Sequence, residues 1–184
     1  MIITISGPAG SGKSTIAKML AEKLGWPRYY MGGLRRDKAR ERGLTLEEYN
    51  KLGETDPSTD LEIDEYQREL GKTKDNFIIE GRTSWYFIPS SIKVYIDVEE
   101  EEGAKRIFIS LNKEAETRNE ANSLHSEEDV LENNRKRRAS DIMRYEKYYN
   151  IDVYNKKNYD IVINTTNKDI KTVFFELEEA LNLN

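Results

Sequence analysis

The chain has 184 residues, enough for a single domain that buries roughly 70 % of the surface its unfolded form exposes. Its 29 Lys and Arg against 34 Asp and Glu give a formal net charge of -5. This balance argues against a nucleic-acid partner, because such proteins neutralise phosphates with an excess of basic residues. The chain has no cysteine and one histidine, His125, which excludes disulfides, thiolate nucleophiles and His-rich zinc sites.

The sequence carries no pattern typical of targeting or membrane insertion. The N-terminus lacks a charged region followed by a long apolar stretch, and no run of about 18 apolar residues occurs in the chain. We therefore expect a cytoplasmic protein that binds neither a membrane nor nucleic acid. We further expect one domain over residues 1–184, a monomer whose partners are small molecules.

The first predicted strand, residues 2–5, leads into the most informative segment of the sequence. Residues 7–14 read GPAGSGKS and fit G-x-x-x-x-G-K-[ST], the P-loop pattern. Its glycines allow backbone N–H groups to turn inward and form a concave anion site. Lys13 would reach the outer phosphates of a nucleotide, and the Ser14 hydroxyl would take one position on Mg²⁺. The predicted phosphate-binding residues are Gly7, Pro8, Ala9, Gly10, Ser11, Gly12, Lys13, Ser14 and Thr15.

The residues after the P-loop predict a helix, as the chemistry of the motif requires. Apolar residues recur at helical spacing from Ser14 to Leu24, and Gly25 is well placed to end the helix. The N-terminus of this helix would add its positive dipole end beneath the phosphates. A glycine turn with an accidental lysine is the alternative, but the order strand, loop, helix favours the P-loop.

The rest of the chain alternates apolar β-branched runs with helical patterns. Strands are predicted at 77–79, 92–98 and 159–163, with a weaker candidate at 26–30. Thr45 and Ser126 each begin a capping-box pattern, so each should start a helix. Asp97 is placed to cap a helix that follows its strand, and apolar spacing predicts a last helix over 170–181. This alternation predicts an α/β, three-layer fold of the P-loop NTPase type, with a parallel sheet of about five strands whose carboxyl edge binds ligands.

Two polar stretches interrupt the alternation. Residues 34–74 have helical character throughout, and we interpret them as an insertion that binds the acceptor. Residues 110–126 are charged and lack an apolar period, and we interpret them as a mobile lid, with a plain solvated loop as the alternative.

Acids and arginines gather where this fold would bring anions. Glu80 and Arg82 follow a buried strand and flank a glycine, which places both at the carboxyl edge of the sheet. Arg137, Asp141 and Arg144 are spaced i, i+4 and i+7, so on a helix they lie within about 60° of one another. An acid between two arginines on one face can orient both guanidinium groups toward a ligand.

Arginine suits phosphate because its planar fork matches two oxygens at once. Two further arginines, Arg35 and Arg36, lie at the start of the helical insertion. For the run 135–138 as a whole, a solvated basic face is the alternative to a binding role.

Together these residues resemble the cytidylate kinase family of nucleoside monophosphate kinases, specifically its short archaeal-like branch. The matching segments are 7–15, 32–49, Asp56-Pro57 with Asp60 and Asp64, 80–82, Arg137 with Asp141 and Arg144, and 159–165. The resemblance implies that the P-loop holds ATP and that Arg36, Arg82 and Arg144 hold the acceptor phosphate. It also implies that Arg137 and Asp141 lie in the active site.

Three departures from the family pattern bear on specificity. Thr83 follows Arg82 where the bacterial branch carries an aspartate that helps to read cytosine. Glu80 stands where an aspartate is common, and Asn164 replaces a frequent aspartate near the expected adenine end. None of these changes removes a phosphate ligand.

The resemblance implies an enzyme that phosphorylates a nucleoside monophosphate, CMP or dCMP, with ATP and Mg²⁺. The expected catalytic residues are Lys13, Arg82, Arg137, Asp141 and Arg144. The expected acceptor-binding residues are Arg36, Arg82 and Arg144 for the phosphate and Asp60, Asp64, Gln67 and Thr83 for the base, with a helix cap after Asp56-Pro57 as the alternative for Asp60. The expected metal contacts are Ser14 and, through water, Glu80. A kinase for another small acceptor is one alternative; a non-catalytic nucleotide switch is less favoured because D-x-x-G and N-K-x-D are missing.

Overall fold

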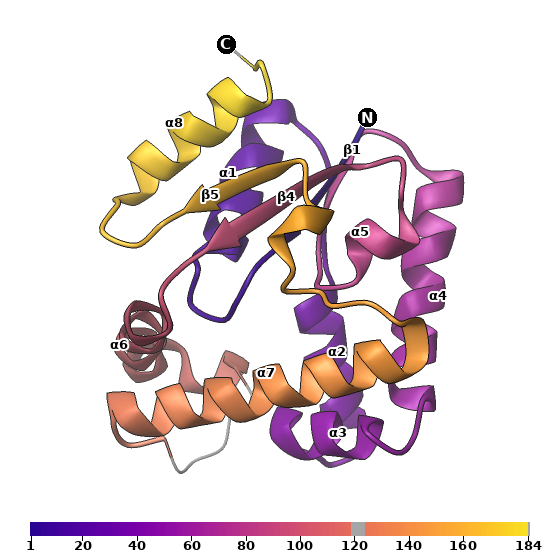
Figure 1. Ribbon diagram of the computed structural model, residues 1–184, viewed down its shortest axis with the longest axis vertical. Helices are drawn as coiled ribbons and strands as arrows, with labels where there is room; N and C mark the ends of the chain where they lie inside the picture. The colour runs from indigo at the N-terminus through magenta and orange to yellow at the C-terminus, as the bar shows by residue number, and fades with distance from the viewer. Residues whose placement is uncertain (119–123, 184) are drawn as a thin grey trace.

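Five parallel strands form the centre of the molecule, in the order β2-β3-β1-β4-β5 (Figure 1). They are β1 (Ile2–Ser6), β2 (Arg28–Tyr30), β3 (Phe77–Glu80), β4 (Ile92–Asp97) and β5 (Ile161–Asn164). The computed structural model describes residues 1–118 and 124–183, except for the side chains of 112–118. The predicted parallel sheet is confirmed. Since β3 and β4 pair with opposite edges of β1, the P-loop leaves the sheet at its topological switch point, where ligands bind in folds of this kind.

The strand β2 starts later than predicted, for a backbone reason. The N–H of Trp26 donates to the carbonyl of Ala21 at 3.0 Å and closes the end of α1 (Lys13–Leu24). Pro27, the next residue, has no N–H to give to a neighbouring strand. The strand β5 likewise starts late, at Ile161: the N–H of Tyr159 donates to the carbonyl of Lys156 at 3.2 Å and closes the 3-10 turn η1 (Lys156–Asn158).

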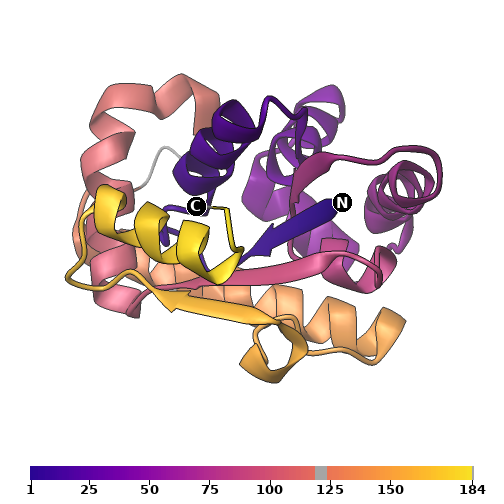
Figure 2. The same ribbon diagram turned by 90° about the horizontal axis from the view of Figure 1, so that it is seen from above.

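Helices cover both faces of the sheet and make three layers (Figures 1 and 2). Successive residues of a strand point to opposite faces, so Ile3 and Ile5 of β1 pack with α1 and α8 (Ile170–Ala180), both at 0 % exposure. Phe77 on β3 faces the other way and packs with apolar residues of α4 (Ser58–Thr73). The central strands are therefore held from both sides, which fixes the edge where their carboxyl ends meet.

The predicted helical insertion consists of α2 (Met31–Glu41), α3 (Leu46–Gly53) and α4. It begins at the residue after β2, slightly earlier than predicted. The capping box at the start of α3 is present: the N–H of Glu48 donates to the Thr45 hydroxyl at 3.2 Å, and the N–H of Thr45 donates to the Glu48 carboxylate at 2.8 Å. Local sequence signals thus correctly define this part of the chain.

After β3 come the short helix α5 (Ser84–Phe87), α6 (Glu100–Arg118) and α7 (Glu127–Tyr149). The helix α7 crosses below the carboxyl ends of the strands (Figure 1). Ser126 caps it as predicted, accepting the N–H of Asp129 at 3.1 Å. None of the described helices combines the length and the apolar character needed to cross a membrane.

The region after β4 differs from expectation in two places. Asp97 does not cap α6: its carboxylate pairs with Lys156 at 2.5 Å, and the N–H of Glu99 donates instead to the Thr166 hydroxyl at 2.9 Å. The predicted lid, 110–126, lies partly on α6, so a plain loop is wrong for its first residues. Residues 119–123 lie outside the described part of the chain, and the mobility of the lid stays a prediction.

Candidate active site

A cavity of about 700 Å³ lies at the carboxyl edge of the sheet, between the P-loop, the helical insertion and the helices α6 and α7. Most of the predicted site residues lie on its wall: Ala9, Gly10, Gly12, Lys13, Ser14, Thr15, Arg36, Asp60, Asp64, Gln67, Glu80, Arg82, Thr83 and Arg137. The predicted residues outside the wall are Gly7, Pro8, Ser11, Asp141 and Arg144. Residues far apart in the sequence thus meet at one edge of the sheet.

The P-loop has a backbone that requires glycine. Gly7, Gly10 and Gly12 have φ angles of 146°, 78° and 82°, a region that residues with a side chain rarely adopt. At Gly10 a β-carbon would also lie 2.1 Å from the carbonyl oxygen of Gly103 on α6. The helix α1 starts at Lys13, so its positive end lies directly under the loop.

Lys13 and Ser14 contact the groups around the loop. The Lys13 amine donates to the carbonyl of Pro8 at 3.0 Å. The Ser14 hydroxyl donates to one carboxylate oxygen of Glu80, the buried last residue of β3. The other oxygen of Glu80 lies 3.2 Å from the guanidinium of Arg28 on β2, which also donates to the carbonyl of Ser14 at 3.2 Å. Side chains of two neighbouring elements, α1 and β2, therefore fix the position of the Glu80 carboxylate.

Ser14 and Glu80 offer oxygen ligands of the kind that Mg²⁺ prefers. Mg²⁺ keeps several waters and is usually held by one or two carboxylates together with substrate phosphates. Within residues 1–118 and 124–183, no group of three or more His, Cys, Asp or Glu is placed to hold a metal ion. The donor set therefore fits an ion that takes most of its ligands from water and from a nucleotide.

The pKa of Lys13 is lowered to about 7 from the ordinary value of 10.5. Burial is the main cause; the Glu80 carboxylate opposes it, and the positive charges of Arg82, Arg137 and Arg36 lower the pKa further. A phosphate bound beside Lys13 would raise this pKa again, because a negative charge favours the protonated amine. The site thus concentrates positive charge where the sequence predicts phosphates.

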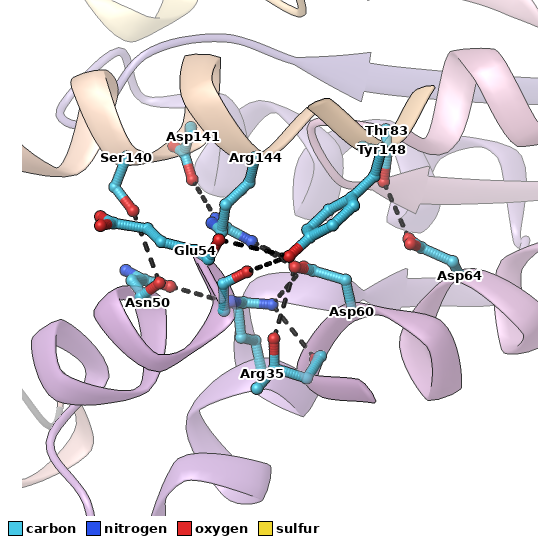
Figure 3. Close-up of polar contacts among 12 residues, drawn as sticks. Arg35, Asn50, Glu54, Asp60, Asp64, Thr83, Ser140, Asp141, Arg144 and Tyr148 are labelled. Atoms are coloured by element: carbon cyan, nitrogen blue, oxygen red, sulfur yellow. Dashed lines mark hydrogen bonds and ion pairs between the residues drawn. The ribbon is translucent and has the colours of Figure 1, made fainter. Parts of the chain in front are cut away.

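A buried ion-pair network lies behind the cavity and joins α2, α4 and α7 (Figure 3). One Arg144 nitrogen donates to both oxygens of Asp60, at 2.7 and 2.6 Å, and the other donates to Asp141 at 2.6 Å. Arg35 reaches Asp60 at 2.5 Å, and Arg82 lies 3.0 Å from Asp141. Burial would raise the pKa of Asp141, but the guanidinium groups of Arg82 and Arg144 outweigh it and hold this pKa below its usual value.

The network bears on the expected roles of Arg144 and Asp60. Arg144 is 0 % exposed and has carboxylates at both ends of its guanidinium, so a direct contact with an acceptor phosphate would require it to leave Asp60 and Asp141. Asp60 neither caps α4 nor offers an unpaired carboxylate to a base, because both of its oxygens accept from arginine. The N–H of Ser58 at the start of α4 donates instead to Asp56, at 2.9 Å.

Three predicted arginines do lie on the cavity wall, namely Arg36, Arg82 and Arg137. Arg36 donates to the hydroxyl of Tyr30 at 2.6 Å and to the carbonyl of Gly32 at 3.1 Å, which orients it along the start of α2. Because these side chains come from α2, from the turn after β3 and from α7, they surround the cavity from three directions.

A second polar group on the wall consists of Asp64, Gln67 and Thr83, each at most 4 % exposed. The Gln67 amide donates to Asp64 and to the Thr83 hydroxyl, both at 3.2 Å, and accepts from the Ser84 hydroxyl at 2.6 Å. The structure thus brings together three of the four predicted base-reading residues in one connected set.

Among the cavity residues that sequence reasoning missed are two arginines, Arg28 and Arg106. Arg106 on α6 donates to the hydroxyl and to the carbonyl of Thr165, both at 2.9 Å, and pairs with Glu102 at 2.8 Å. The i, i+4 spacing from Glu102 was its only sequence signal, and that spacing is common on solvated helices. The contact with Thr165 depends on the tertiary fold alone.

Comparison with known proteins agrees with this geometry. The chain matches the Cytidylate kinase-like family over residues 2–167. A protein named cytidylate kinase from Methanocella arvoryzae is 38 % identical over 99 % of this chain and 97 % of its own length. A protein of the same name from Natronomonas pharaonis is 35 % identical, over 99 % of this chain and 90 % of its own length.

Solved structures resemble the fold at lower identity. The crystal structure of shikimate kinase from Bacteroides thetaiotaomicron superposes with a TM-score of 0.65 and 15 % identity, covering 99 % of this chain and 98 % of that one. This likeness concerns the fold, which is shared by kinases of different acceptors. The sequence match covers nearly the whole chain and is more specific than the likeness in fold. This chain therefore belongs to the cytidylate kinase-like family.

Proposed function

We propose that this protein transfers the γ-phosphoryl group of ATP to a nucleoside monophosphate, CMP or dCMP, giving the diphosphate and ADP. The observation that carries the proposal is that the P-loop and the arginines Arg36, Arg82 and Arg137 line one cavity. Relatives that are 35–38 % identical over nearly the whole chain are named cytidylate kinase, which supports a pyrimidine acceptor.

In this reaction an oxygen of the acceptor phosphate forms a bond to the γ-phosphorus, and the bond from that phosphorus to the oxygen of ADP breaks. Both reactants are anions, so the protein must offset their repulsion and hold them in line. Lys13 and the loop N–H groups would hold the donor, and Arg36, Arg82 and Arg137 would hold the acceptor and the transferring group. The attacking oxygen is already ionised, so the step needs no general base.

Mg²⁺ would neutralise charge on the outer phosphates of ATP when bound. Ser14 would hold it directly and Glu80 through water, in keeping with the adjacent oxygens of these two side chains. The role of Arg28 is then to orient Glu80, since it donates to that carboxylate and to the backbone of the P-loop.

The buried ion-pair network supports the acceptor site from behind. Asp141 orients Arg82, and Arg144 joins Asp141 to Asp60, which in turn orients Arg35. We therefore assign Asp141 and Arg144 to positioning, in place of direct contact with the substrate. The base would lie against Asp64, Gln67 and Thr83.

An acceptor panel tests the proposal. The purified protein with ATP and Mg²⁺ is given CMP, dCMP, UMP, AMP or GMP, and formation of ADP and of each diphosphate is followed. We expect the highest kcat/KM with CMP or dCMP. A higher value for a purine monophosphate would overturn the pyrimidine assignment, and ATP binding without turnover of any monophosphate would favour a kinase for another acceptor.

A further inference from the structure

Asp64 has different partners on its two carboxylate oxygens. One oxygen accepts from the Gln67 amide at 3.2 Å and from the Thr83 hydroxyl at 3.4 Å, and Figure 3 shows Thr83 pointing toward Asp64. The other accepts from the hydroxyl of Tyr149, in the last turn of α7, which does not lie on the cavity wall. A carboxylate has about four acceptor positions, so these three bonds leave one position on the oxygen that Tyr149 contacts.

Every neighbour of Asp64 in this set acts as a donor. The Ser84 hydroxyl donates to the Gln67 carbonyl oxygen at 2.6 Å, and this turns the Gln67 amide nitrogen toward Asp64 and Thr83. Thr83 accepts from Gln67 and is left with its own hydrogen to give to Asp64. The arrangement therefore suits an ionised Asp64 that accepts hydrogen bonds.

Burial works against that ionised form. It raises the pKa of Asp64 to about 6; the hydrogen bond from Tyr149 lowers this pKa, Asp60 raises it, and Arg35 and Arg68 lower it. Among these influences, Tyr149 is an uncharged group that opposes burial by a direct contact with the carboxylate.

The direction of the Tyr149 hydroxyl is fixed by packing of its ring. The ring lies edge to face with Phe87, with centroids 5.3 Å apart, and next to Tyr145 at 6.4 Å and Tyr86 at 5.8 Å. Aromatic rings packed in this way have few alternative orientations. The hydroxyl is therefore delivered to Asp64 from α7, while Asp64 itself belongs to α4.

We propose that Tyr149 is a positioning residue for recognition of the acceptor base: it holds Asp64 ionised and turned so that its remaining acceptor position serves the exocyclic amino group of cytosine. The inference rests on the proposed function. Uracil presents a carbonyl where cytosine presents that amino group, so an ionised Asp64 favours CMP and a neutral Asp64, which is a donor, favours UMP. The preference for CMP over UMP then falls as the pH drops through the pKa of Asp64. The hydrogen bond from Tyr149 sets the pH at which this change occurs.

The substitution Tyr149→Phe removes the hydroxyl and keeps the ring. Tyr148→Phe is the matched control, because the Tyr148 hydroxyl donates to the carbonyl of Gly53 at 3.0 Å instead of to Asp64. The ratio of kcat/KM for CMP to that for UMP is measured from pH 5 to 8. Loss of one hydrogen bond to a carboxylate should move the midpoint of this ratio up by about one pH unit in Tyr149→Phe, and leave it in place in the control.

A measurement that needs no turnover accompanies the kinetics. NMR titration of the Asp64 carboxyl carbon should give a higher pKa in Tyr149→Phe than in the wild-type protein. If Tyr149→Phe does not fold, 3-fluorotyrosine placed at position 149 serves instead: it is a stronger donor and should move the midpoint and the Asp64 pKa downward.

The outcomes separate the inference from the function on which it rests. An unchanged Asp64 pKa in a folded, active Tyr149→Phe protein, or with 3-fluorotyrosine at position 149, overturns the inference alone. A wild-type protein that phosphorylates neither CMP nor UMP overturns the proposed function and the base-recognition role with it.

Discussion

At the scale of single residues, Lys13 links nucleotide binding to pH. The pKa of Lys13 in the protein without nucleotide is about 7. Bound phosphates raise this pKa, so above about pH 7 Lys13 takes up a proton when the nucleotide binds. Affinity for ATP should therefore be constant below about pH 7 and fall by up to tenfold per pH unit above it, until the raised pKa is reached. Calorimetric titration of Mg·ATP between pH 6 and 9 measures this.

Lys13→Arg is the control, because arginine stays protonated over this range. It should bind more weakly overall but with no dependence on pH between 7 and 9. A wild-type affinity that stayed flat over the same interval would show that Lys13 is charged throughout and that burial does not govern it.

Arg144 offers a test of the buried network. Arg144→Ala leaves Asp60 and Asp141 buried with one guanidinium fewer, and breaking such a pair costs about 3–5 kcal/mol. The free energy of unfolding from urea denaturation should drop by about this amount. Arg138→Ala on the exposed side of α7, where the pair with Glu100 is 3.3 Å long, should change it by less than about 1 kcal/mol. Equal losses in both variants would mean that burial of the network is not what stabilises the fold.

Arg82 differs from Arg144 because it reaches the cavity wall. Arg82→Ala should lower kcat/KM for the acceptor at least tenfold, about 1.4 kcal/mol of transition-state binding, while the affinity for ATP measured by calorimetry stays within a factor of about three. Were ATP affinity to collapse while the acceptor kinetics held, Arg82 would belong to the donor side.

At the scale of elements, the backbone of α6 lies close to the backbone of the P-loop, and Gly103 makes this contact possible. A β-carbon on Gly103 would lie 2.8 Å from the carbonyl oxygen of Ala9 and 3.1 Å from the side chain of Val98. Gly103→Ala must therefore push α6 away from the loop. We expect a KM for ATP that rises several-fold, with the KM for the acceptor little changed, in steady-state assays.

Gly43→Ala is a suitable control for backbone effects. Gly43 lies in the connection between α2 and α3 with a φ of 70° and open space where a β-carbon would lie. The Gly43→Ala variant should lose about 1–2 kcal/mol of stability through backbone strain, and its KM for ATP should be unchanged. If both variants raised that KM alike, the effect would come from general destabilisation and not from the position of α6.

At the scale of the whole molecule, the cavity joins the P-loop, the helical insertion, α6 and α7, so a bound nucleotide should stabilise the fold as one unit. At a concentration 100 times its Kd, a ligand adds about 2.7 kcal/mol. For a chain of this size that corresponds to a rise in Tm of roughly 5–11 °C. Scanning calorimetry with Mg·ATP measures it; Lys13→Ala at the same ATP concentration should show little rise, and an equal rise in both would place ATP elsewhere.

The sequence by itself determined the parts of this protein whose causes are local. Strand, loop and helix follow one another within about 25 residues at the P-loop, and glycine at 7, 10 and 12 suits the positive φ angles of the loop. The cap at Thr45 depends on contacts three residues apart, and the parallel sheet follows from alternation of strands and helices.

Only the tertiary structure decided which polar groups pair. The spacing of Arg144 and Asp141 predicted a shared helix face, but the third partner, Asp60, lies 84 residues away from Arg144. Tyr149 and Asp64 are 85 residues apart. A helical period gives the direction of a side chain but not the residue that the fold places opposite it, so the buried pairing of Arg144 with Asp60 could not be read from the sequence.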